Sequence, residues 1–333
     1  MPISNDILSS TLRVLAKDAV DQLFQSTPLL NEIKGKGGVE TIDGGQKIER
    51  PMILSEHSTI TQLSSGYEPI NLAVSDVLRT ASFNWCDFVA PVVITKKEEL
   101  SNRGPRAVLS IAEARLKSVM GMLKREWEKQ AILGTSTVLT EMNTLNGENT
   151  AATGFLEAKT IATQVNSVGG LARGTFSDLK NQYKDCGGNI SVTEMTDLLI
   201  QCQINSPSGV PSLILASAAS YSAYKGVLFA NERFVKETAL DGGRLALAFH
   251  NAMMYVDPDM PSGVPTPIGT NTSSMFFLNP EFIKVVFDSA ANFTMEDFES
   301  VSGYASRSAN IMVRTQLIFD HLKSQGVLAN AEA

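Results

Sequence analysis

The chain has 333 residues, of which 43% are hydrophobic and 19% are charged, and its formal net charge is −7 at pH 7. A chain of this length and composition can bury two or three packed units, which excludes a wholly disordered protein, a collagen-like fibre and a disulfide scaffold. The acidic balance argues against a large cationic face that binds nucleic-acid phosphates, so we expect any contact with DNA to be weak and nonspecific.

The first predicted element is an amphipathic helix from Asp6 to Phe24. Apolar residues recur along it at helical spacing, among them Leu12 and Leu15, and such a helix needs a partner surface for its apolar face. The segments Val39–Ile42 and Lys47–Leu54 flank an Asp-Gly-Gly turn. Together they predict a short hairpin.

An extended β loop is predicted next, from strand signals at Thr59–Leu63 and Leu78–Ile94. Phe83 and Trp85 lie on one face of the second strand by the two-residue period of a strand. A two-stranded ribbon is marginally stable in water, because it has no second layer over its apolar face. We therefore expect Phe83, Trp85 and Phe88 to be covered by neighbouring chains, with coverage by the rest of this chain as the alternative.

Pro105 begins a long predicted helix, because proline is tolerated in the first turn, where its missing N–H costs nothing. Apolar residues then recur every three or four positions until Gly134 ends the pattern. The predicted helix is roughly 40 Å long at about 1.5 Å per residue. Its charged face, which includes Arg115, Lys124 and Arg125, is most simply solvated, with a contact between subunits as the other interpretation.

A loop rich in Thr, Asn and Gly leads to a second unit in which helix and strand signals alternate. We therefore expect a sheet flanked by helices. The predicted elements are a helix over Phe176–Cys186, a helix from a Ser191–Glu194 capping box to Ile204, a buried strand over Leu213–Leu215, a helix over Ala218–Lys225 and a strand over Leu245–Val256.

The last part of the chain predicts three strands and a loose tail. Met275–Leu278 and Phe282–Phe287 are short apolar segments typical of strands. The alternation over Ile311–Phe319 predicts a long strand that is partly covered on both faces. We expect the tail from Gly326 onward to be frayed.

Motifs for catalysis, cofactors or metals do not stand out in the sequence. His57, His250 and His321 have no second ligand at metal-binding spacing. The glycine pairs complete no phosphate-binding pattern, and no nucleophile elbow is present. Asp257 and Asp259 lack the glycine and glutamate of a calcium loop, so we interpret them as part of a turn. We predict no catalytic, cofactor or metal site, although groups from distant positions could converge.

The cysteines and the start of the chain bear on its compartment. Cys86, Cys186 and Cys202 are an odd number of widely spaced cysteines, which favours reduced thiols in a cytosol. Residues 1–11 carry no positive charge ahead of an apolar run, and no apolar stretch approaches the roughly 20 residues that span a bilayer. We expect a chain that folds in a cytoplasm without membrane contact.

The order of these elements resembles that of the major capsid proteins of tailed double-stranded-DNA bacteriophages. The residues that carry the resemblance are Ser82–Trp85 before Val92–Ile94, Glu98–Gly104 at the start of the long helix, and Met275–Pro280 late in the chain. It extends over nearly the whole chain and rests on the arrangement of elements and on short strings of residues.

The resemblance implies an α+β fold with five parts and a structural function. The parts are an N-terminal arm (1–50), an extended β loop (51–95), a peripheral domain with the long spine helix (96–150), an α/β axial domain (151–300), and a return strand of the peripheral domain with the C-terminal tail (301–333). Many copies would form pentamers and hexamers that close an icosahedral shell around packaged DNA, with the extended loop lying over a neighbouring subunit. Such rings use heterologous contacts, in which one patch meets a different patch next door.

Interface residues and partners follow from this resemblance as expectations. The candidate interface residues are Tyr67, Phe83, Trp85 and Phe88 on the loop, Leu12 and Leu15 on the arm, and Arg115, Lys124 and Arg125 on the spine helix. The expected partners are further copies of the chain, a separate scaffolding protein, a portal, possibly a decoration protein, and packaged DNA without sequence preference. The expected location is the virion, after assembly in the host bacterial cytoplasm.

Two departures from the family pattern refine these expectations. Some members join subunits covalently through a lysine on the extended loop, but this chain has no lysine between Lys47 and Lys96. We therefore predict a shell without that linkage. About fifty residues precede the loop, which is short for a fused assembly domain, so we expect a separately encoded scaffold and full-length subunits in mature particles.

Two other functions stay open on the sequence alone. One is a shell protein of a bacterial encapsulating nanocompartment, which shares the fold and encloses an enzyme. The other is a cytosolic α/β enzyme with an active site between Ala151 and Asp288. A monomer with a well-formed pocket would favour the enzyme, and a neighbouring cargo gene would favour the compartment.

Overall fold

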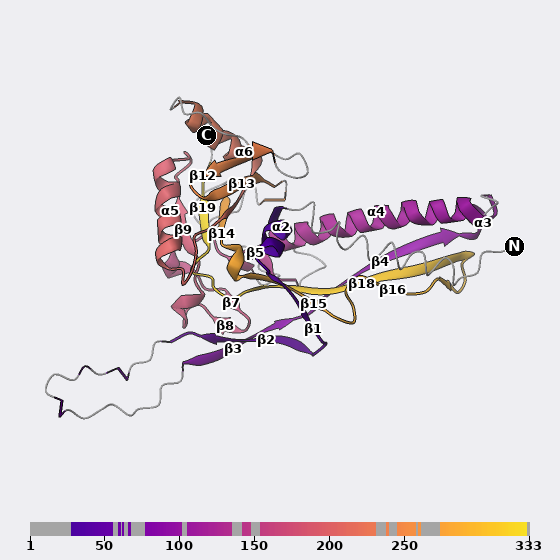
Figure 1. Ribbon diagram of the computed structural model, residues 1–333, viewed down its shortest axis with the longest axis horizontal. Coiled ribbons are helices and arrows are strands. Elements are labelled where there is room, and N and C mark those ends of the chain that lie inside the picture. The colour runs from indigo at the N-terminus through magenta and orange to yellow at the C-terminus, as the bar shows by residue number, and fades with distance from the viewer. Residues whose placement is uncertain are drawn as a thin grey trace.

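The computed structural model describes residues 28–55, 59–60, 62, 66–67, 77–101, 105–134, 142–147, 154–230, 238–239, 245–257, 259–260 and 274–331. The expected helix Asp6–Phe24, with Leu12 and Leu15, lies outside these residues. The molecule is elongated and has an arm, a lobe and a ribbon (Figure 1). The arm contains α4 (Pro105–Ile132), the lobe contains α5 (Val192–Ile204) and α6 (Ala218–Ala230), and the ribbon consists of β2 (Lys47–Ile53) and β3 (Leu78–Asn84).

The arm combines α4 with two long strands, β4 (Cys86–Thr95) and β18 (Ser306–Phe319). The two strands pair antiparallel along the whole of β4, over ten residue pairs. Residues of β4 alternate between buried and exposed, so one face packs against α4, where Leu116 and Trp127 are buried, and the other faces outward. The predicted long helix and returning strand are confirmed.

β18 is the strand that organises a six-stranded sheet. Its C-terminal half pairs with β15 (Ile283–Asp288), which confirms the strand predicted there. The other strands are β1 (Val39–Ile42), which is parallel to β15, and β16 (Thr294–Met295) and β17 (Glu299–Ser300), which pair with β18.

The lobe holds a mixed seven-stranded sheet. Its predicted strands Leu213–Leu215 and Met275–Leu278 are confirmed, and every residue of both is buried. Alternate residues face opposite sides: Ile214 packs in a core with residues of α5 and α6, whereas Leu215 packs in the core that continues into the arm. In order across the sheet, the strands are β11 (Thr238–Ala239), β12 (Leu245–Phe249), β13 (Ala252–Val256), β10 (Leu213–Ala216), β14 (Met275–Leu278), β19 (Gly326–Ala329) and β9 (Gln182–Asp185).

Short elements connect these parts. The helices are α2 (Pro28–Gly35), α3 (Lys96–Ser101) and the single-turn helices η1 (Ile161–Thr163), η2 (Ser177–Leu179) and η3 (Pro280–Phe282), and the strands are β5 (Thr144–Asn146), β6 (Gly154–Leu156), β7 (Ser167–Val168) and β8 (Leu171–Ala172). None of the helices in the described part of the chain combines the length and apolar character that crossing a bilayer requires.

The local predictions for helices in the lobe have a mixed outcome. α5 begins after Ser191, whose hydroxyl accepts a hydrogen bond from the Thr193 N–H, and α6 lies where it was predicted. The helix predicted over Phe176–Cys186 is wrong, because this segment forms η2 and then β9. The pairing of β9 with β19, far along the chain, overrides its local preference.

Three strand predictions also need correction. Val39–Ile42 and Lys47–Leu54 form strands but no hairpin, because each strand pairs with a different distant partner. The single strand predicted over Leu245–Val256 is a hairpin of β12 and β13. In the segment Thr59–Leu63, the described residues lie outside any strand.

The C-terminal tail is an ordered part of the core. The frayed tail predicted from Gly326 is wrong, because β19 lies between β14 and β9 and all four of its residues are buried. β19 thus lies in the sheet of the lobe, whereas β18 lies in the sheet of the arm.

We predict that Leu328→Ala lowers the free energy of unfolding by about 2–5 kcal/mol, because the side chain is fully buried and its removal leaves a cavity. The matched control is Ile204→Ala, since Ile204 is exposed on α5 and its truncation should cost less than about 0.5 kcal/mol. Urea unfolding of unassembled subunits measures both values. Equal effects of the two variants would contradict the position of β19 in the core.

Candidate subunit interface

The aromatic residues predicted to need a neighbouring chain are covered by their own chain. Phe83, Trp85 and Phe88 are only 2–6% exposed. The ring centroid of Phe83 lies 6.2 Å from that of Phe155, and the indole N–H of Trp85 donates a hydrogen bond to the Gly45 carbonyl at 3.0 Å. The inference from an uncovered apolar ribbon is therefore wrong.

The physical reason is a change of sheet at Trp85. This residue lies between β3, which pairs with β2, and β4, which pairs with β18. Only β3 belongs to the ribbon, and Phe88 lies on the face of β4 that packs against α4. A continuous strand from Leu78 to Ile94 was predicted because the apolar pattern runs through the break.

The outer end of the ribbon is where apolar side chains are exposed. Ile53 and Leu78 lie directly opposite each other on β2 and β3, and they are 72% and 58% exposed. Ile60 and Tyr67, which follow in the loop, are almost fully exposed. We call Ile53 and Leu78 the ribbon-end pair. Tyr67 thus has the exposure that its predicted interface role requires, and that role stays a prediction.

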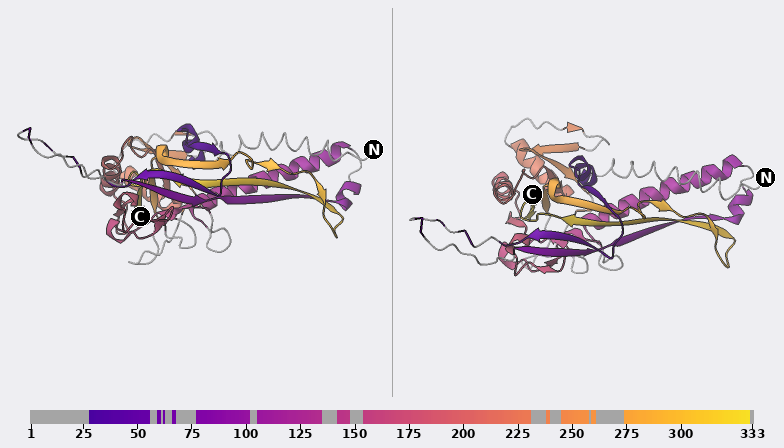
Figure 2. Two further views of the ribbon diagram at one scale, coloured as in Figure 1. Left: turned by 90° about the horizontal axis from the view of Figure 1, so that it is seen from below. Right: turned by 60° about the horizontal axis from the view of Figure 1, so that its bottom comes forward.

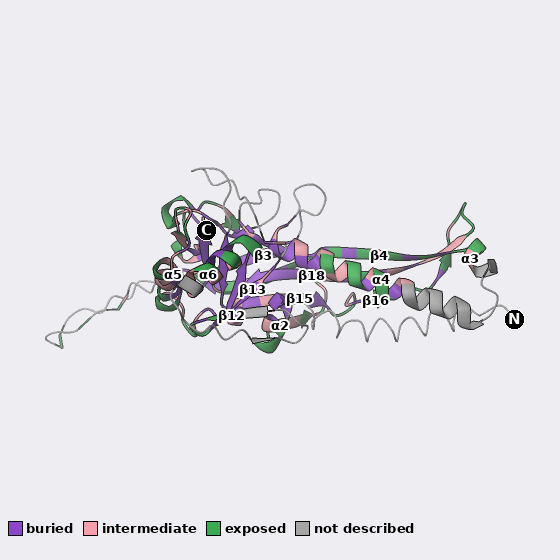
Figure 3. Cartoon of the chain, turned by 90° about the horizontal axis from the view of Figure 1, so that it is seen from above, coloured by how far each residue is buried: buried purple, intermediate pink, exposed green. Residues whose placement is uncertain are grey.

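Exposed residues lie along β4 on the arm (Figure 3), and the apolar ones among them form a second exposed surface. Val89 on β4 and Met312 on β18 are exposed and opposite each other, and Pro91 and Val93 continue the row along β4. We call these four residues the outer strip. Singly exposed apolar residues are common, but a row of them on one sheet face indicates a surface for another molecule.

Charged residues border one end of the outer strip. Arg314 donates two hydrogen bonds to the Asp87 carboxylate, at 2.7 and 3.1 Å, and these bonds raise the pKa of Arg314. Asp87 and Arg314 are opposite each other in the β4–β18 pairing, next to Val89 and Met312. A second molecule on the outer strip would therefore contact an apolar row. At the end of this row, the charges of Asp87 and Arg314 neutralise each other.

The predicted interface residues of the long helix differ in their surroundings. Arg115 forms an ion pair with Glu98 and donates a hydrogen bond to the Val93 carbonyl, so it acts within its own chain. Lys124 is half-buried and Arg125 is exposed. Contacts of these three residues with another subunit stay predictions.

Glu98 belongs to a helix cap that the sequence reasoning missed. The hydroxyl and the N–H of Thr95 both donate to one oxygen of the Glu98 carboxylate, at 2.7 and 3.1 Å, and the Glu98 N–H donates back to the Thr95 hydroxyl at 3.4 Å. This is a capping box at the start of α3, and the Thr-x-x-Glu spacing was its signal in the sequence. The hydrogen bonds from Thr95, with help from Arg115, lower the pKa of Glu98 to about 2.

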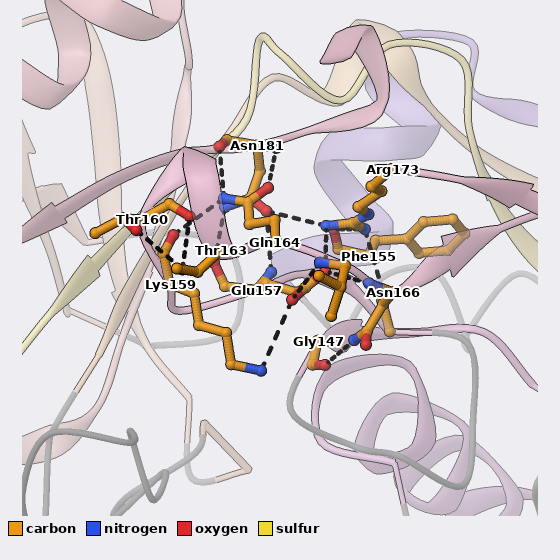
Figure 4. Close-up of polar contacts among 12 residues, drawn as sticks. Gly147, Phe155, Glu157, Lys159, Thr160, Thr163, Gln164, Asn166, Arg173 and Asn181 are labelled. Atoms are coloured by element: carbon orange, nitrogen blue, oxygen red, sulfur yellow. Dashed lines mark hydrogen bonds and ion pairs between the residues drawn. The ribbon is translucent and has the colours of Figure 1, made fainter. Parts of the chain in front are cut away.

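Buried polar side chains form a second constellation, shown in Figure 4. Glu157 and Arg173 have no exposed surface, and their closest oxygen and nitrogen lie 3.3 Å apart. The Glu157 carboxylate also accepts hydrogen bonds from the N–H groups of Val165 and Asn166, at 3.4 and 2.9 Å. Arg173 donates to the carbonyls of Gly154 and Phe155. Burial lowers the pKa of Arg173 to about 10.

This constellation joins segments of the chain, and its carboxylate is fully paired. The carboxylate is bound on both oxygens, and Asn181 links the group further by donating to the Glu157 carbonyl at 3.1 Å. The sequence gave no local signal for this cluster, because its charged residues are far from one another in a polar part of the chain. The cluster holds together the segments that follow β6, η1 and β8.

A cavity of about 790 Å³ is relevant to the alternative that the chain is an enzyme, because an active site needs a pocket. It is lined by β2, the C-terminal end of α5 and the turn after β18. Lys323 in its wall pairs with Asp178, and Arg50 pairs with Glu40. His321 also lines it, and burial lowers the pKa of this imidazole. Among the described residues, no cluster of His, Cys, Asp and Glu could hold a metal ion.

We predict that Thr95→Val raises the pKa of Glu98 from about 2 toward the ordinary value of 4.5, because it removes the largest stabilisation of the ionised carboxylate. In the native chain the lowered pKa makes the stabilising effect of this group complete above pH 4.5 and lost as the pH falls toward 2. A carboxyl-detected NMR titration measures the pKa. A native value near 4.5 would show that the cap does not persist in solution.

We predict that Arg173→Met lowers the free energy of unfolding by about 3–5 kcal/mol, because it leaves the Glu157 charge buried without its partner. Glu157→Gln should also destabilise the chain, and the double variant should cost less than the sum of the two. A double-mutant cycle from urea unfolding measures this coupling. Lys184→Met, which removes the half-buried ion pairs of Lys184 with Glu194 and Asp197, is the control. Additive effects at 157 and 173 would mean that the two side chains act independently.

The comparisons with known proteins identify the fold. The sequence matches no protein-family model and none of the curated proteins. A chain of the capsid asymmetric unit of cyanophage A-1(L) superposes with a TM-score of 0.63 at 14% identity, over 92% of both chains. The SrpI encapsulin of Synechococcus elongatus PCC 7942 superposes with a TM-score of 0.55 at 10% identity, over 92% of this chain and 88% of that one. A capsid chain of an empty GTA particle superposes with a TM-score of 0.55 at 10% identity, over 88% of this chain and 94% of that one. The chain therefore has the α+β fold of tailed-phage capsid proteins, which encapsulins share.

Proposed function

We propose that this chain is the major capsid protein of a tailed double-stranded-DNA phage. Copies of it assemble into pentamers and hexamers that close an icosahedral shell around packaged DNA. The single observation that carries the proposal is the likeness to a phage capsid chain over 92% of both chains, because a match of that extent includes both the arm and the lobe. Its role is structural, and we assign it no reaction.

The two exposed apolar surfaces support this function. Figure 2 shows the ribbon and the arm pointing to opposite ends of the molecule. The ribbon-end pair of one copy and the outer strip of the next copy can therefore meet in a heterologous contact, which is the kind that closes rings. Full burial of each apolar side chain would contribute about 1.5–3 kcal/mol, so a shell can be held by many such contacts without covalent linkage.

Other parts of the proposal have no contact in the described residues that tests them. The N-terminal helix with Leu12 and Leu15, the loop with Tyr67, and the charged residues Arg115, Lys124 and Arg125 remain proposed interface residues. Phe83, Trp85 and Phe88 are not among the proposed interface residues, because they are buried within their own chain. We also propose a separate scaffolding protein, a portal, an optional decoration protein and nonspecific contact with DNA, in a virion assembled in the host cytoplasm.

A nanocompartment shell is the second candidate, because the fold likeness extends to an encapsulin. The contents of the particle separate the two functions. Particles that protect double-stranded DNA from nuclease, or a neighbouring portal or packaging-motor gene, support the phage capsid. Particles that retain one co-purifying enzyme support the compartment. Negative-stain microscopy of the protein expressed alone and with a candidate scaffold tests assembly itself, and a strictly monomeric protein under both conditions would contradict both shell functions.

We predict that Val89→Asp raises the critical concentration for assembly at least about tenfold, because a contact that buries an unpaired charge loses more than about 1.4 kcal/mol. Val89→Leu at the same position keeps the apolar surface and is the control. Sedimentation of subunits and particles measures the concentration, and circular dichroism checks the fold. Assembly of Val89→Asp at the native concentration would remove the outer strip from the interface.

A further inference from the structure

The ribbon leaves the body of the molecule at one crossing point. Gly45 precedes β2 and Trp85 follows β3, and the hydrogen bond from the Trp85 indole to the Gly45 carbonyl joins them at 3.0 Å. Beyond this point, β3 contacts the hairpin of β7 and β8. The Ser82 N–H donates to the Gly169 carbonyl at 2.9 Å. The hairpin thus supports the ribbon a few residues outward from the crossing point.

Gly169 makes this support unusually close. A Cβ atom at this position would lie 2.6 Å from the Cβ of Ala81 and 3.1 Å from the ring of Phe83. Contacts under 3 Å between such atoms force a shift, so any side chain at 169 would push β3 away from the hairpin. The neighbouring Gly170 also has positive φ, but a Cβ there would meet open space. The close contact with the ribbon therefore requires glycine at position 169 but not at position 170.

The buried polar cluster fixes both ends of the same hairpin. Asn166 directly precedes β7, and its N–H donates to an oxygen of Glu157 at 2.9 Å. Arg173 directly follows β8 and pairs with the same oxygen at 3.3 Å. One buried carboxylate thus closes the base of the hairpin whose turn carries Gly169. Arg173 also binds the Phe155 carbonyl, and the Phe155 ring contacts Phe83 of the ribbon.

We propose that Gly169, held by the Glu157–Arg173 pair, is the positioning residue that sets the direction of the β2–β3 ribbon. Ser82 is about 10 Å from Trp85 along the strand and Leu78 is about 23 Å from it, at about 3.3 Å per residue. A displacement of about 1 Å at Ser82 therefore becomes about 2 Å at the ribbon-end pair. Dispersion contacts are largely lost over that distance. The consequence for assembly rests on the proposed function, whereas the contact itself does not.

The test compares Gly169→Ala with Gly170→Ala. Both place alanine at positive φ and carry similar backbone strain, but only the first inserts a methyl group against the ribbon. Ala81→Val adds bulk to the same contact from the β3 side without that strain. The double variant Gly169→Ala/Ala81→Gly relieves the closest clash and should recover at least half of any loss on a logarithmic scale.

Two measurements read out these variants. Hydrogen exchange of the Ser82 amide in unassembled subunits should speed up at least tenfold in Gly169→Ala and Ala81→Val, and less than about twofold in Gly170→Ala. The critical concentration for assembly should rise at least tenfold in the same two variants. Equal behaviour of the variants at 169 and 170, or no recovery in the double variant, overturns the proposal.

The proposed shell function and the positioning role of Gly169 can fail separately. If the native chain forms no particles, the proposed function fails, and exchange at Ser82 still decides whether Gly169 holds the ribbon. If the native chain forms particles and Gly169→Ala assembles like Gly170→Ala, only the positioning role of Gly169 is overturned.

Discussion

The pairing of β4 with β18 is the constraint on which the rest of the structure depends. It joins the first third of the chain to its end over ten residue pairs and gives α4 a sheet to pack on. Most of the stability of a helix in a protein comes from the packing of its apolar face, so α4 needs this partner. The same pairing leaves the opposite face of β4 outward, with Val89 and Met312 exposed. One strand pair thus supplies both the stability of the arm and a surface for another copy.

The buried Glu157–Arg173 ion pair lies at the base of the β7–β8 hairpin. The Glu157–Arg173 pair is a poor source of net stability, because desolvation offsets much of the attraction between the two charges. Its geometry is nevertheless specific, since each partner reaches several backbone groups that come from different segments. A hairpin closed by such a pair can position the ribbon through a backbone contact at Gly169, where a purely apolar contact would be free to slide.

The fold by itself does not separate a virus shell from a cellular compartment. Phage capsid chains and an encapsulin superpose on this chain with similar coverage. What distinguishes them is the material enclosed, and a shared fold can serve unrelated contents. The net charge of −7 suits an inner wall from which packaged DNA can be released, and it suits a compartment equally well.

Local sequence determined the elements whose ends and faces are encoded within a few residues. Pro105 and Gly134 mark α4, Ser191 caps α5, and the apolar strands at 213–216 and 275–278 lie where their composition indicates. The tertiary structure alone decided which strands pair, that the tail from Gly326 forms a core strand, and that Trp85 is covered by its own chain. The reason is that an apolar pattern shows that a face must be buried, whereas the segment that buries it lies far away in the sequence and leaves no local mark.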